Sequence, residues 1–553
     1  MWKILFFFAS IVCGGTTHVS LVQSFVTRPD ILAPVLDIRK IDNSIVSSGS
    51  IFLTTWEGEA QSAPYIYATN GPHHLSNGTS VLSVFRGHSD SGRGQGHAAL
   101  LDSSYNLFRT VEIPSSRSAL DFHEFNILDD GNMAVAVAFQ PYQGDLSHLG
   151  IKDTLGWLLD SVFLCIDLES GAVAFEWKAS DHISVNESVV WPSLKNGAGL
   201  AYNHAFDWFH INSVARFENG DYLLSARHTD TIYRLDRRDG TVVWRLGGPL
   251  SSFLMDGVDF SAQHDARIVS ESAENGNVVI SLYNNGFNGQ TRTETVSSAM
   301  MVEIDKHAMT ARLVREAFAP IPGLAQNTGS LQYLPNKGNF LVSWGQMTDY
   351  SGFTEFGKDG QIALDVAFGD PSTRNYRVRK DRWTGRPTEE PEVYLYAQYP
   401  GASTHFWISW NGATDVTYWK AYELQPDKEK FLKNLEKDGF ETHVNLETFI
   451  SEGYVEAIGG DGRILGRSKR CKVFIPPATL AESCGEAHCR KQIMHAKERR
   501  VEMRPSGETA GRFQWRKEVM QTVILLSIGY AIGRSRGLAG MFVRRRHAVM
   551  AEG

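Results

Sequence analysis

The chain has 553 residues, and its 62 acidic and 54 basic side chains leave a net charge of −8. This balance excludes the basic surface that is typical of nucleic-acid-binding proteins, so we expect no nucleic-acid partner. Hydrophobic residues make up 42% of the chain, which suffices for a core and excludes wholesale disorder. The 50 glycines and the mostly short apolar runs favour many strands joined by tight turns over a helical bundle.

The N-terminus has the layout of a secretory signal peptide over residues 1–20. Lys3 is followed by the apolar run Ile4 to Cys13 and then by small residues. The glycosylation triplets at Asn77 and Asn186 are compatible with an exported glycoprotein. We therefore expect the chain in the secretory pathway, secreted or membrane-anchored with its folded part lumenal or extracellular.

One repeated unit organises the middle of the chain. It reads apolar-x-Asp, a turn, Gly and then an alternating strand, as in Leu164–Trp177 and again in Tyr233–Leu246. The aspartates of three copies, Asp167, Asp236 and Asp305, stand at a constant interval. Such spacing indicates a structural repeat of about 70 residues.

A second hairpin type lies between these copies. Its turns supply the residues that tolerate positive φ in a tight hairpin, at Asp130-Gly-Asn, Asn219-Gly-Asp, Asn275-Gly-Asn and Asn336-Lys-Gly-Asn. Each repeat therefore holds two hairpins, or four strands.

Recurring four-stranded units predict an all-β fold with a β-propeller of five or six blades within residues 25–382. A single β-sandwich would not repeat in this way. The repeat pattern of the sequence changes after Trp383, and residues 383–475 are expected to form a small fibronectin/immunoglobulin-like β-sandwich.

The C-terminal part differs in composition from the rest. Residues 476–518 are rich in charge and predict a stalk or linker. Val519 to Gly533 carries no charge and is followed by basic residues, which favours a transmembrane anchor with a basic tail over residues 519–540. A span usually needs about 20 apolar residues, so an amphipathic or packed terminal helix is the alternative.

Cysteine usage predicts one disulfide and no metal site. Cys165 lies in an apolar run and is expected in a core. Cys471, Cys484 and Cys489 are close in sequence, and an oxidising compartment favours one disulfide among them, with the pairing open. Cys484 and Cys489, with His488 between them, lack a second ligand pair at zinc spacing.

Candidate catalytic residues gather where strands of the second hairpin type begin. His210 and Asn212 precede the Asn219 turn, and strand alternation would place both on one face. His264 and Arg267 begin the equivalent strand one repeat later, and His123-Glu124 begins it one repeat earlier. In a propeller such strand ends face the central channel.

Two further polar residues end the strand after the His210 hairpin. Arg227 and His228 are expected near His210, and the arginines and Asn212 could donate hydrogen bonds to an oxyanion. No phosphate-binding loop or dinucleotide fingerprint accompanies these residues, so no cofactor is predicted.

Several ordered motifs resemble the arylsulfotransferase family, specifically its secreted fungal-type branch. They are Asp207-Trp-Phe-His-Ile-Asn-Ser-Val214, Leu224-Ser-Ala-Arg-His228, Val243-Trp-Arg-Leu-Gly-Gly248, Gln263-His-Asp-Ala-Arg267 and Gly329-Ser-Leu-Gln-Tyr-Leu-Pro335. The resemblance covers roughly Phe25 to Ser468.

The resemblance implies a six-bladed propeller that moves a sulfuryl group from a phenolic sulfate ester to another phenol through a transiently sulfated histidine. It needs no nucleotide donor, and the partners are a small aryl sulfate and a phenol. The family motif maps onto His210 and Asn212, and a second motif onto His264. With these three residues, the expected catalytic set comprises His228, Arg227 and Arg267. The alternative is a non-catalytic secreted propeller that binds a glycan or protein at its channel mouth.

Overall fold

The computed structural model describes residues 22–56, 66–90, 92–113, 119–128, 130–147, 155–272, 274 and 276–477. They belong to one compact unit that ends at Ala481. The predicted signal peptide, residues 478–518 of the stalk, the predicted anchor, Cys484 and Cys489 lie outside these residues. Within the described part, no helix has both the length and the apolar character needed to cross a membrane.

Strands dominate the described chain, which confirms the all-β prediction. The α-helix α1 spans only Ala179–His182, and the other described helices are single 3₁₀ turns. Most strands are five to thirteen residues long and antiparallel to their neighbours.

Five sheets each contain four consecutive antiparallel strands. In the first sheet these are β5 (Ile66–His74), β6 (Ser80–Asp90), β7 (Arg93–Leu101) and β8 (Leu107–Val111). In the second they are β9 (Asp121–Ile127), β10 (Met133–Asp145), β11 (Leu155–Asp167) and β12 (Val173–Lys178). In the third they are β14 (Ile211–Arg216), β15 (Tyr222–Ala226), β16 (Thr231–Leu235) and β17 (Val242–Gly247). In the fourth they are β19 (His264–Glu271), β20 (Val278–Asn284), β21 (Ser298–Asp305) and β22 (Thr310–Phe318). In the fifth they are β23 (Ser330–Leu334), β24 (Asn339–Ser343), β25 (Gly352–Phe356) and β26 (Ile362–Phe368).

The remaining strands extend or join these sheets. β13 (Phe206–Asp207) pairs with β11, β18 (Leu254–Asp256) with β22, and β3 (Leu36–Ile41) with β26. β1 (Val22–Ser24) pairs with β2 (Leu32–Pro34), and β4 (Ser50–Trp56) pairs with β27 (Arg374–Asp381).

The hairpin turns are those that the sequence predicts. The second hairpin type connects the first two strands of a sheet, and its glycines Gly131, Gly220, Gly276 and Gly338 all have positive φ. The aspartate turns connect the last two strands, as at Asp167 between β11 and β12. Two hairpins per repeat therefore make one four-stranded sheet.

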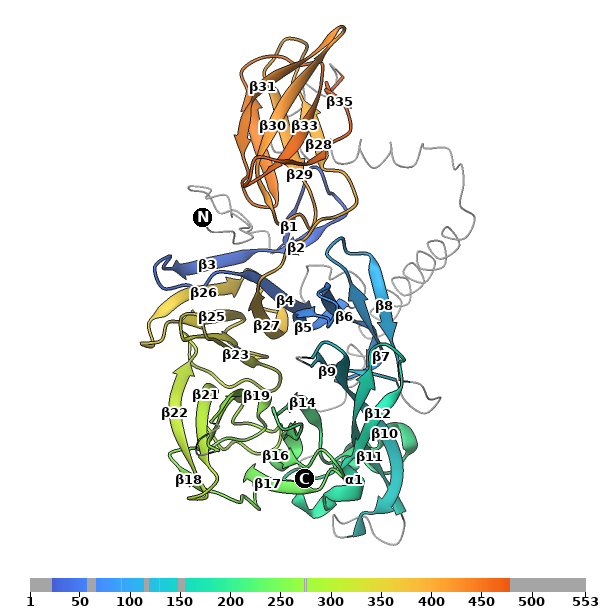
Figure 1. Cartoon of the computed structure of the whole chain (residues 1–553), viewed down its shortest axis with the longest axis vertical. Helices are drawn as coiled ribbons and strands as arrows, with labels where there is room; N and C mark the ends of the chain where they lie inside the picture. The colour runs from blue at the N-terminus through green and yellow to red at the C-terminus, as the bar shows by residue number, and fades with distance from the viewer. Residues whose placement is uncertain are drawn as a thin grey trace, which may run out of the picture. The chain divides into compact units, whose positions relative to one another are not determined.

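The first strands of successive sheets contact one another and close a ring. β5 contacts β9, β9 contacts β14, β14 contacts β19, and β19 contacts β23. β27 contacts both β23 and β5, so a strand from the far end of this region completes the ring (Figure 1). We call β5, β9, β14, β19, β23 and β27 the inner strands.

The hydrophobic core lies between successive sheets rather than in one central mass. One cluster joins the second and third sheets and includes Cys165, as predicted, together with Trp177 and Trp208. The Trp177 indole also donates a 3.0 Å hydrogen bond to the Gly240 carbonyl in the next sheet. Packing and hydrogen bonding thus fix each sheet against its neighbour.

Two further sheets form the region from residue 392 to residue 472. One has the order β28 (Glu392–Tyr396), β29 (Thr404–Ser409) and β32 (Glu441–Leu446). The other contains β31 (Lys428–Glu436), β30 (Val416–Gln425), β33 (Glu452–Gly459) and β34 (Ile464–Arg467), with β35 (Cys471–Lys472) beside β33. Side chains from both sheets, including Trp419, share one hydrophobic cluster.

A buried ionic layer ties the inner strands together. It consists of Glu124 from β9, Asp265 and Arg267 from β19, and Arg377 and Arg379 from β27. Asp265 Oδ1 accepts from Arg379 at 2.6 Å and from Arg267 at 2.9 Å. Arg267 also reaches Glu124 at 2.7 Å, and Arg377 donates to two inner-strand carbonyls, those of His123 and Asn212.

The ionic layer makes a testable contribution to stability. Burial alone would raise the pKa of the Asp265 carboxyl, but Arg379, Arg267 and Arg377 hold that pKa far below its ordinary value. A carboxyl with a depressed folded-state pKa stabilises the fold above its unfolded-state pKa, near 3.9, and loses this effect as the pH falls further. We expect Asp265→Asn to lower the free energy of unfolding by about 3–5 kcal/mol at pH 7, because it leaves buried guanidinium charge unpaired.

Thermal unfolding from pH 7 to pH 3 checks this expectation. The gap in Tm between the variant and the wild type should be widest at pH 7 and narrow below pH 4. Asp461→Asn, in an exposed turn where the carboxylate meets Arg463, is the matched control and should leave Tm nearly unchanged. An equally small effect of Asp265→Asn would contradict a structural role for the layer.

Candidate active site

Four ring side chains meet at the inner strands. His123 lies in β9, His210 immediately precedes β14, His264 opens β19 and Tyr376 lies in β27. The ring centres of His123 and His210 are 4.7 Å apart, those of His123 and Tyr376 are 5.8 Å apart, and those of Tyr376 and His264 are 6.3 Å apart. We name this group the histidine cluster, and it also includes Arg227 and His228.

His210 is held by a hydrogen bond to a carboxylate. Its Nδ1 donates to Asp207 Oδ2 at 2.6 Å, which leaves the lone pair of Nε2 on the other side of the ring. Burial lowers the pKa of His210 well below its ordinary value, and the positive charge of Arg227 acts in the same direction. His210 is therefore a neutral imidazole whose Nε2 can act as a nucleophile.

The backbone at His210 explains its position. Its φ is 59°, in the left-handed region, and the pairing of β14 with β15 is irregular at the next residues. The expected alternation between His210 and Asn212 is therefore wrong, since alternation requires an extended backbone. The Asn212 amide instead donates to the Gln263 carbonyl at 2.7 Å and joins two inner strands.

Arg227 and His228 follow β15 directly, as predicted, and pair with the chain at His210. The Arg227 amide donates to the His210 carbonyl at 2.9 Å, and the His228 amide donates to the Phe209 carbonyl at 3.0 Å. Arg227 Nη1 lies 2.7 Å from His228 Nε2, and because a guanidinium can only donate, Nε2 must accept. His228 Nδ1 then donates to the Asp207 carbonyl at 2.6 Å.

Both nitrogens of His228 are therefore occupied. Burial lowers the pKa of His228 to about 3, so its ring stays neutral at physiological pH. The ring holds Arg227, whose Nη2 donates to the Gln326 carbonyl at 2.9 Å. The Arg227 Nε–H is buried and has no hydrogen-bond partner among the described residues, so it is available to an anionic ligand.

His264 has a fixed tautomer as well. Asn285 Nδ2 donates to the carbonyls of Ala325 and Thr328, so Asn285 Oδ1 must be the acceptor that faces His264. His264 Nδ1 donates to this oxygen at 2.7 Å, and its Nε2 keeps a lone pair. Burial lowers the pKa of His264 well below its ordinary value.

His123 and Tyr376 complete the cluster. His123 Nδ1 donates to Asp121 Oδ1 at 2.5 Å, which repeats the carboxylate arrangement of His210. The Tyr376 hydroxyl is buried without a partner in the described part of the chain, and burial raises the pKa of this phenol above its ordinary value. Tyr376 therefore stays protonated and can donate a hydrogen bond to a ligand.

One expected site residue, Arg267, is committed to the ionic layer instead. Its side chain donates to Glu124, to Asp265 and to the Val214 carbonyl. These pairs raise the pKa of Arg267 above its ordinary value despite burial. The structure thus brings His210, His228, Arg227 and His264 together and places Asn212 and Arg267 in supporting contacts.

Comparison with known protein families decides the family of this chain. Residues 71–369 match the model of a family described as arylsulfotransferase (ASST), and the match covers more than half of the chain. The chain belongs to the arylsulfotransferase family. The expected membership of the fungal-type branch stays a prediction, and no curated protein matches the chain.

Solved structures resemble this arylsulfotransferase-family chain only distantly. A protein of unknown function from Bacteroides caccae is 12% identical, with a TM-score of 0.32 over 56% of this chain and 85% of its own. One from Dyadobacter fermentans is 11% identical, with a TM-score of 0.34 over 64% and 92%. A virginiamycin B lyase from Staphylococcus aureus is 9% identical, with a TM-score of 0.26 over 75% and 97%. At these scores the likenesses carry no argument about the site.

Asp207, His210 and His228 could also be considered as metal ligands, because one potential ligand atom of each lies within 4.8 Å of the others. The hydrogen bonds of this arylsulfotransferase-family chain use these groups differently. His210 Nδ1 and Asp207 Oδ2 bond to each other, and His228 Nε2 accepts from Arg227. Asp207 Oδ1 has no hydrogen-bond partner among the described residues, but a cation there would lie beside the Arg227 guanidinium and could not use His228 Nε2, so the three residues do not fit a metal site as a set.

Sequence reasoning did not include three residues of the site. Asp207 lies in the same sequence motif as His210, and this polar residue close to His210 could have been predicted as its hydrogen-bond partner. His123 was placed at the strand start equivalent to those of His210 and His264, but it was not among the expected catalytic residues. Tyr376 had no local signal, because β27 joins the ring only through its contacts with β5 and β23.

The hydrogen-bond pattern predicts the protonation state of His228. Because burial lowers the pKa of His228 to about 3, we expect its ring to stay neutral, with the proton on Nδ1, from pH 7 down to pH 4.5. Long-range ¹H–¹⁵N spectra of protein with labelled histidine measure the tautomer, and His228→Gln assigns the signal. Titration of this signal near pH 6 would contradict the arrangement.

Proposed function

We propose that this protein is an aryl sulfotransferase that moves a sulfuryl group from a phenolic sulfate ester to another phenol through a sulfated histidine. The observation that carries the proposal is the Asp207–His210 pair, which leaves a neutral ring with an Nε2 lone pair. The same cluster contains the Arg227 Nε–H, which has no hydrogen-bond partner among the described residues. A nucleophile oriented by a carboxylate and an adjacent cation is what sulfuryl transfer requires. Membership of the arylsulfotransferase family supports the same reaction.

His210 is the proposed nucleophile. Its Nε2 attacks the sulfur of the donor ester, an S–N bond forms, and the S–O bond breaks with its electron pair leaving on the phenolate oxygen. A sulfated imidazole that keeps its Nδ1 proton carries a positive charge on its ring and a negative charge on its sulfuryl group, and the Asp207 carboxylate stabilises the positive ring. Asn285, the partner of His264, is neutral and gives no such stabilisation.

Arg227 and Tyr376 are the proposed stabilisers of negative charge. Both carry donors without protein partners in the described part of the chain, the Arg227 Nε–H and the Tyr376 hydroxyl. Such preorganised donors can bind the sulfuryl oxygens and the departing phenolate, and each is worth about 100- to 1,000-fold in rate in comparable sites. His228 acts as a positioning residue through its contact with Arg227.

His264 is the proposed general base for the second half of the reaction. Its Nε2 lone pair accepts the proton of the acceptor phenol, whose oxygen attacks sulfur, and the S–N electron pair returns to His210 Nε2. The negative sulfuryl group favours the resulting imidazolium. His264 then releases the proton to solvent, which protonates the first phenolate, so the enzyme returns to its starting state.

Aromatic side chains next to the nucleophile support a phenolic substrate. The Phe139 ring centre lies 5.7 Å from that of His210, and Phe122 stacks on His123 at 4.7 Å. Phe139 is only partly buried, so one face can contact the ring of a bound phenol.

The finer architecture belongs to the same proposal. We propose that residues 25–382 form a six-bladed propeller, in which β4 and β27 belong to the blade that closes the ring, followed by a sandwich at residues 383–475. The contacts that join six inner strands into a ring support the blade number. The shared core of the two sheets between residues 392 and 472 supports the sandwich.

Two substitutions test the catalytic assignment. His210→Asn removes the nucleophile and should abolish transfer from an aryl sulfate to a phenol. His264→Asn removes one base and should lower kcat by about 100- to 10,000-fold while leaving measurable turnover. Transfer is measured by release of the donor phenol, and initial rates at varied donor and acceptor should give the parallel lines of a two-step mechanism.

The control for this test is His405→Asn, which changes a histidine of β29 outside the cluster and should leave the rate unchanged. Unchanged transfer in both cluster variants would contradict the assignment. A wild-type protein that binds a glycan or a protein and shows no transfer would favour the binding propeller instead.

Export and membrane anchoring rest on sequence alone. We propose that residues 1–20 direct the chain into the secretory pathway and that the uncharged segment from Val519 to Gly533 anchors it. Full-length protein in a eukaryotic host should then stay with the membranes during carbonate extraction, whereas a chain ending at Glu518 should be released. Release of both would overturn the anchor.

A further inference from the structure

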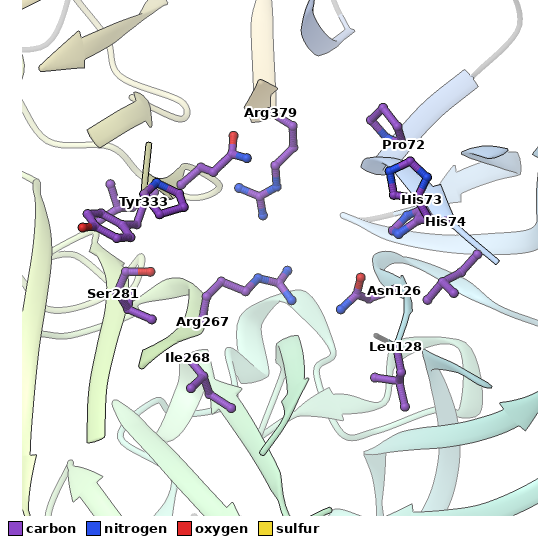
Figure 2. A pocket seen from close by; sticks show the side chains of 15 residues that line it. Pro72, His73, His74, Asn126, Leu128, Arg267, Ile268, Ser281, Tyr333 and Arg379 are labelled. Carbon is purple, nitrogen blue, oxygen red and sulfur yellow. The ribbon is translucent and has the colours of Figure 1, made fainter. Parts of the chain in front are cut away.

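A pocket lies beside the ionic layer. It has a volume of about 520 Å³ and is lined by residues from β5, β9, β19, β20, β23 and β27. Figure 2 shows the side chains of Arg267, Arg379 and Asn126 turned toward its middle. None of the residues of the histidine cluster lines this pocket, so it is separate from the proposed active site.

The ionic layer behind the pocket carries an excess positive charge. Three guanidinium groups, those of Arg267, Arg377 and Arg379, face two carboxylates, those of Glu124 and Asp265. The Arg267 guanidinium is fully engaged with these carboxylates and a carbonyl. The five side chains of the layer therefore carry a formal charge of +1.

The Arg379 guanidinium is the group of the layer to which an anionic ligand can bind. Only 9% of Arg379 is exposed, and its Nη2 donates to Asp265 at 2.6 Å. Its Nη1 is buried and has no hydrogen-bond partner among the described residues. A buried guanidinium N–H without a partner is costly, and an anion that enters the pocket would remove that cost.

Other lining groups can also donate to an anion. The Ser281 hydroxyl is buried and unpartnered within the described chain, and the Asn126 side chain, which carries an amide donor, also lines the pocket. The described residues that line the pocket include no acidic side chain that would repel an anion. Burial lowers the pKa of His73 to about 4, so this neighbour is neutral and adds no charge of its own.

We propose that this pocket binds the carboxylate or sulfate group of a small polar molecule, with Arg379 as the anchor and Ser281 and Asn126 as further donors. The formal charge of +1 on the ionic layer and the unpartnered Nη1 of Arg379 fit a monoanion. The volume fits a molecule about the size of a monosaccharide acid or sulfate. This site is independent of the proposed sulfuryl transfer.

Calorimetric titration of the full-length protein at constant ionic strength tests the site. D-glucuronate and glucose 6-sulfate are the probes, and neutral glucose is their matched control. We expect saturable binding of at least one anion and none of glucose. Arg379→Gln should weaken that binding by more than tenfold, and Ser281→Ala by about tenfold, since each removes a donor to a charged group.

Asn126→Asp keeps the test decisive if Arg379→Gln fails to fold. It places a negative charge in the pocket without altering the ionic layer, and it should weaken anion binding by more than tenfold while leaving aryl sulfotransfer unchanged. Arg227→Gln, in the histidine cluster, should leave anion binding unchanged. The proposal is overturned if neither anion binds saturably, if Ser281→Ala and Asn126→Asp bind as the wild type does, or if Arg227→Gln abolishes binding.

Discussion

The buried ionic layer is the constraint on which the rest of the structure depends. Strand hydrogen bonds hold each sheet together, and packing fixes each sheet against its neighbour. The ionic layer adds directional contacts between inner strands that are not neighbours in the ring, from β19 to β9 and from β27 to β19. Arg377, from the strand that closes the ring, donates to the carbonyls of both His123 and Asn212. The same layer therefore closes the ring and fixes the backbone next to two positions of the histidine cluster.

Hydrogen bonds then set the chemistry of the cluster. His123, His210 and His264 each donate from Nδ1 to an acceptor of the surrounding chain, which leaves their Nε2 lone pairs available. Burial lowers the pKa of His210 and of His264 well below its ordinary value, so these two rings are neutral before the reaction. The acceptors differ, since two are carboxylates and one is the amide of Asn285. Because of this difference, we assign His210 as the nucleophile, whose ring can carry a positive charge, and His264 as the base, which holds a proton only briefly.

Much of this arrangement could be predicted from local sequence. Turn glycines such as Gly220 marked the hairpins, and the two hairpin types gave four strands per repeat. The constant interval of the aspartates gave the length of the repeat. The strands that begin near His210 and His264 could therefore be matched to each other. Features set by tertiary contacts could not be predicted. The left-handed backbone of His210, which overturned the alternation with Asn212, could not be read from the sequence, because a positive φ is uncommon for any residue other than glycine. The hydrogen bond between Arg267 and Glu124 and the position of Tyr376 in the histidine cluster both depend on the closure of the ring.

The central claim is that His210 Nε2 carries the sulfuryl group. Rapid mixing of the enzyme with a ³⁵S-labelled aryl sulfate in the absence of acceptor, followed by alkaline quench and peptide mapping, measures where the label resides. The account predicts an acid-labile label of about one equivalent on the peptide that contains His210, chased by added phenol. Label on a peptide containing His123 or His264, or no label in an active preparation, would contradict it.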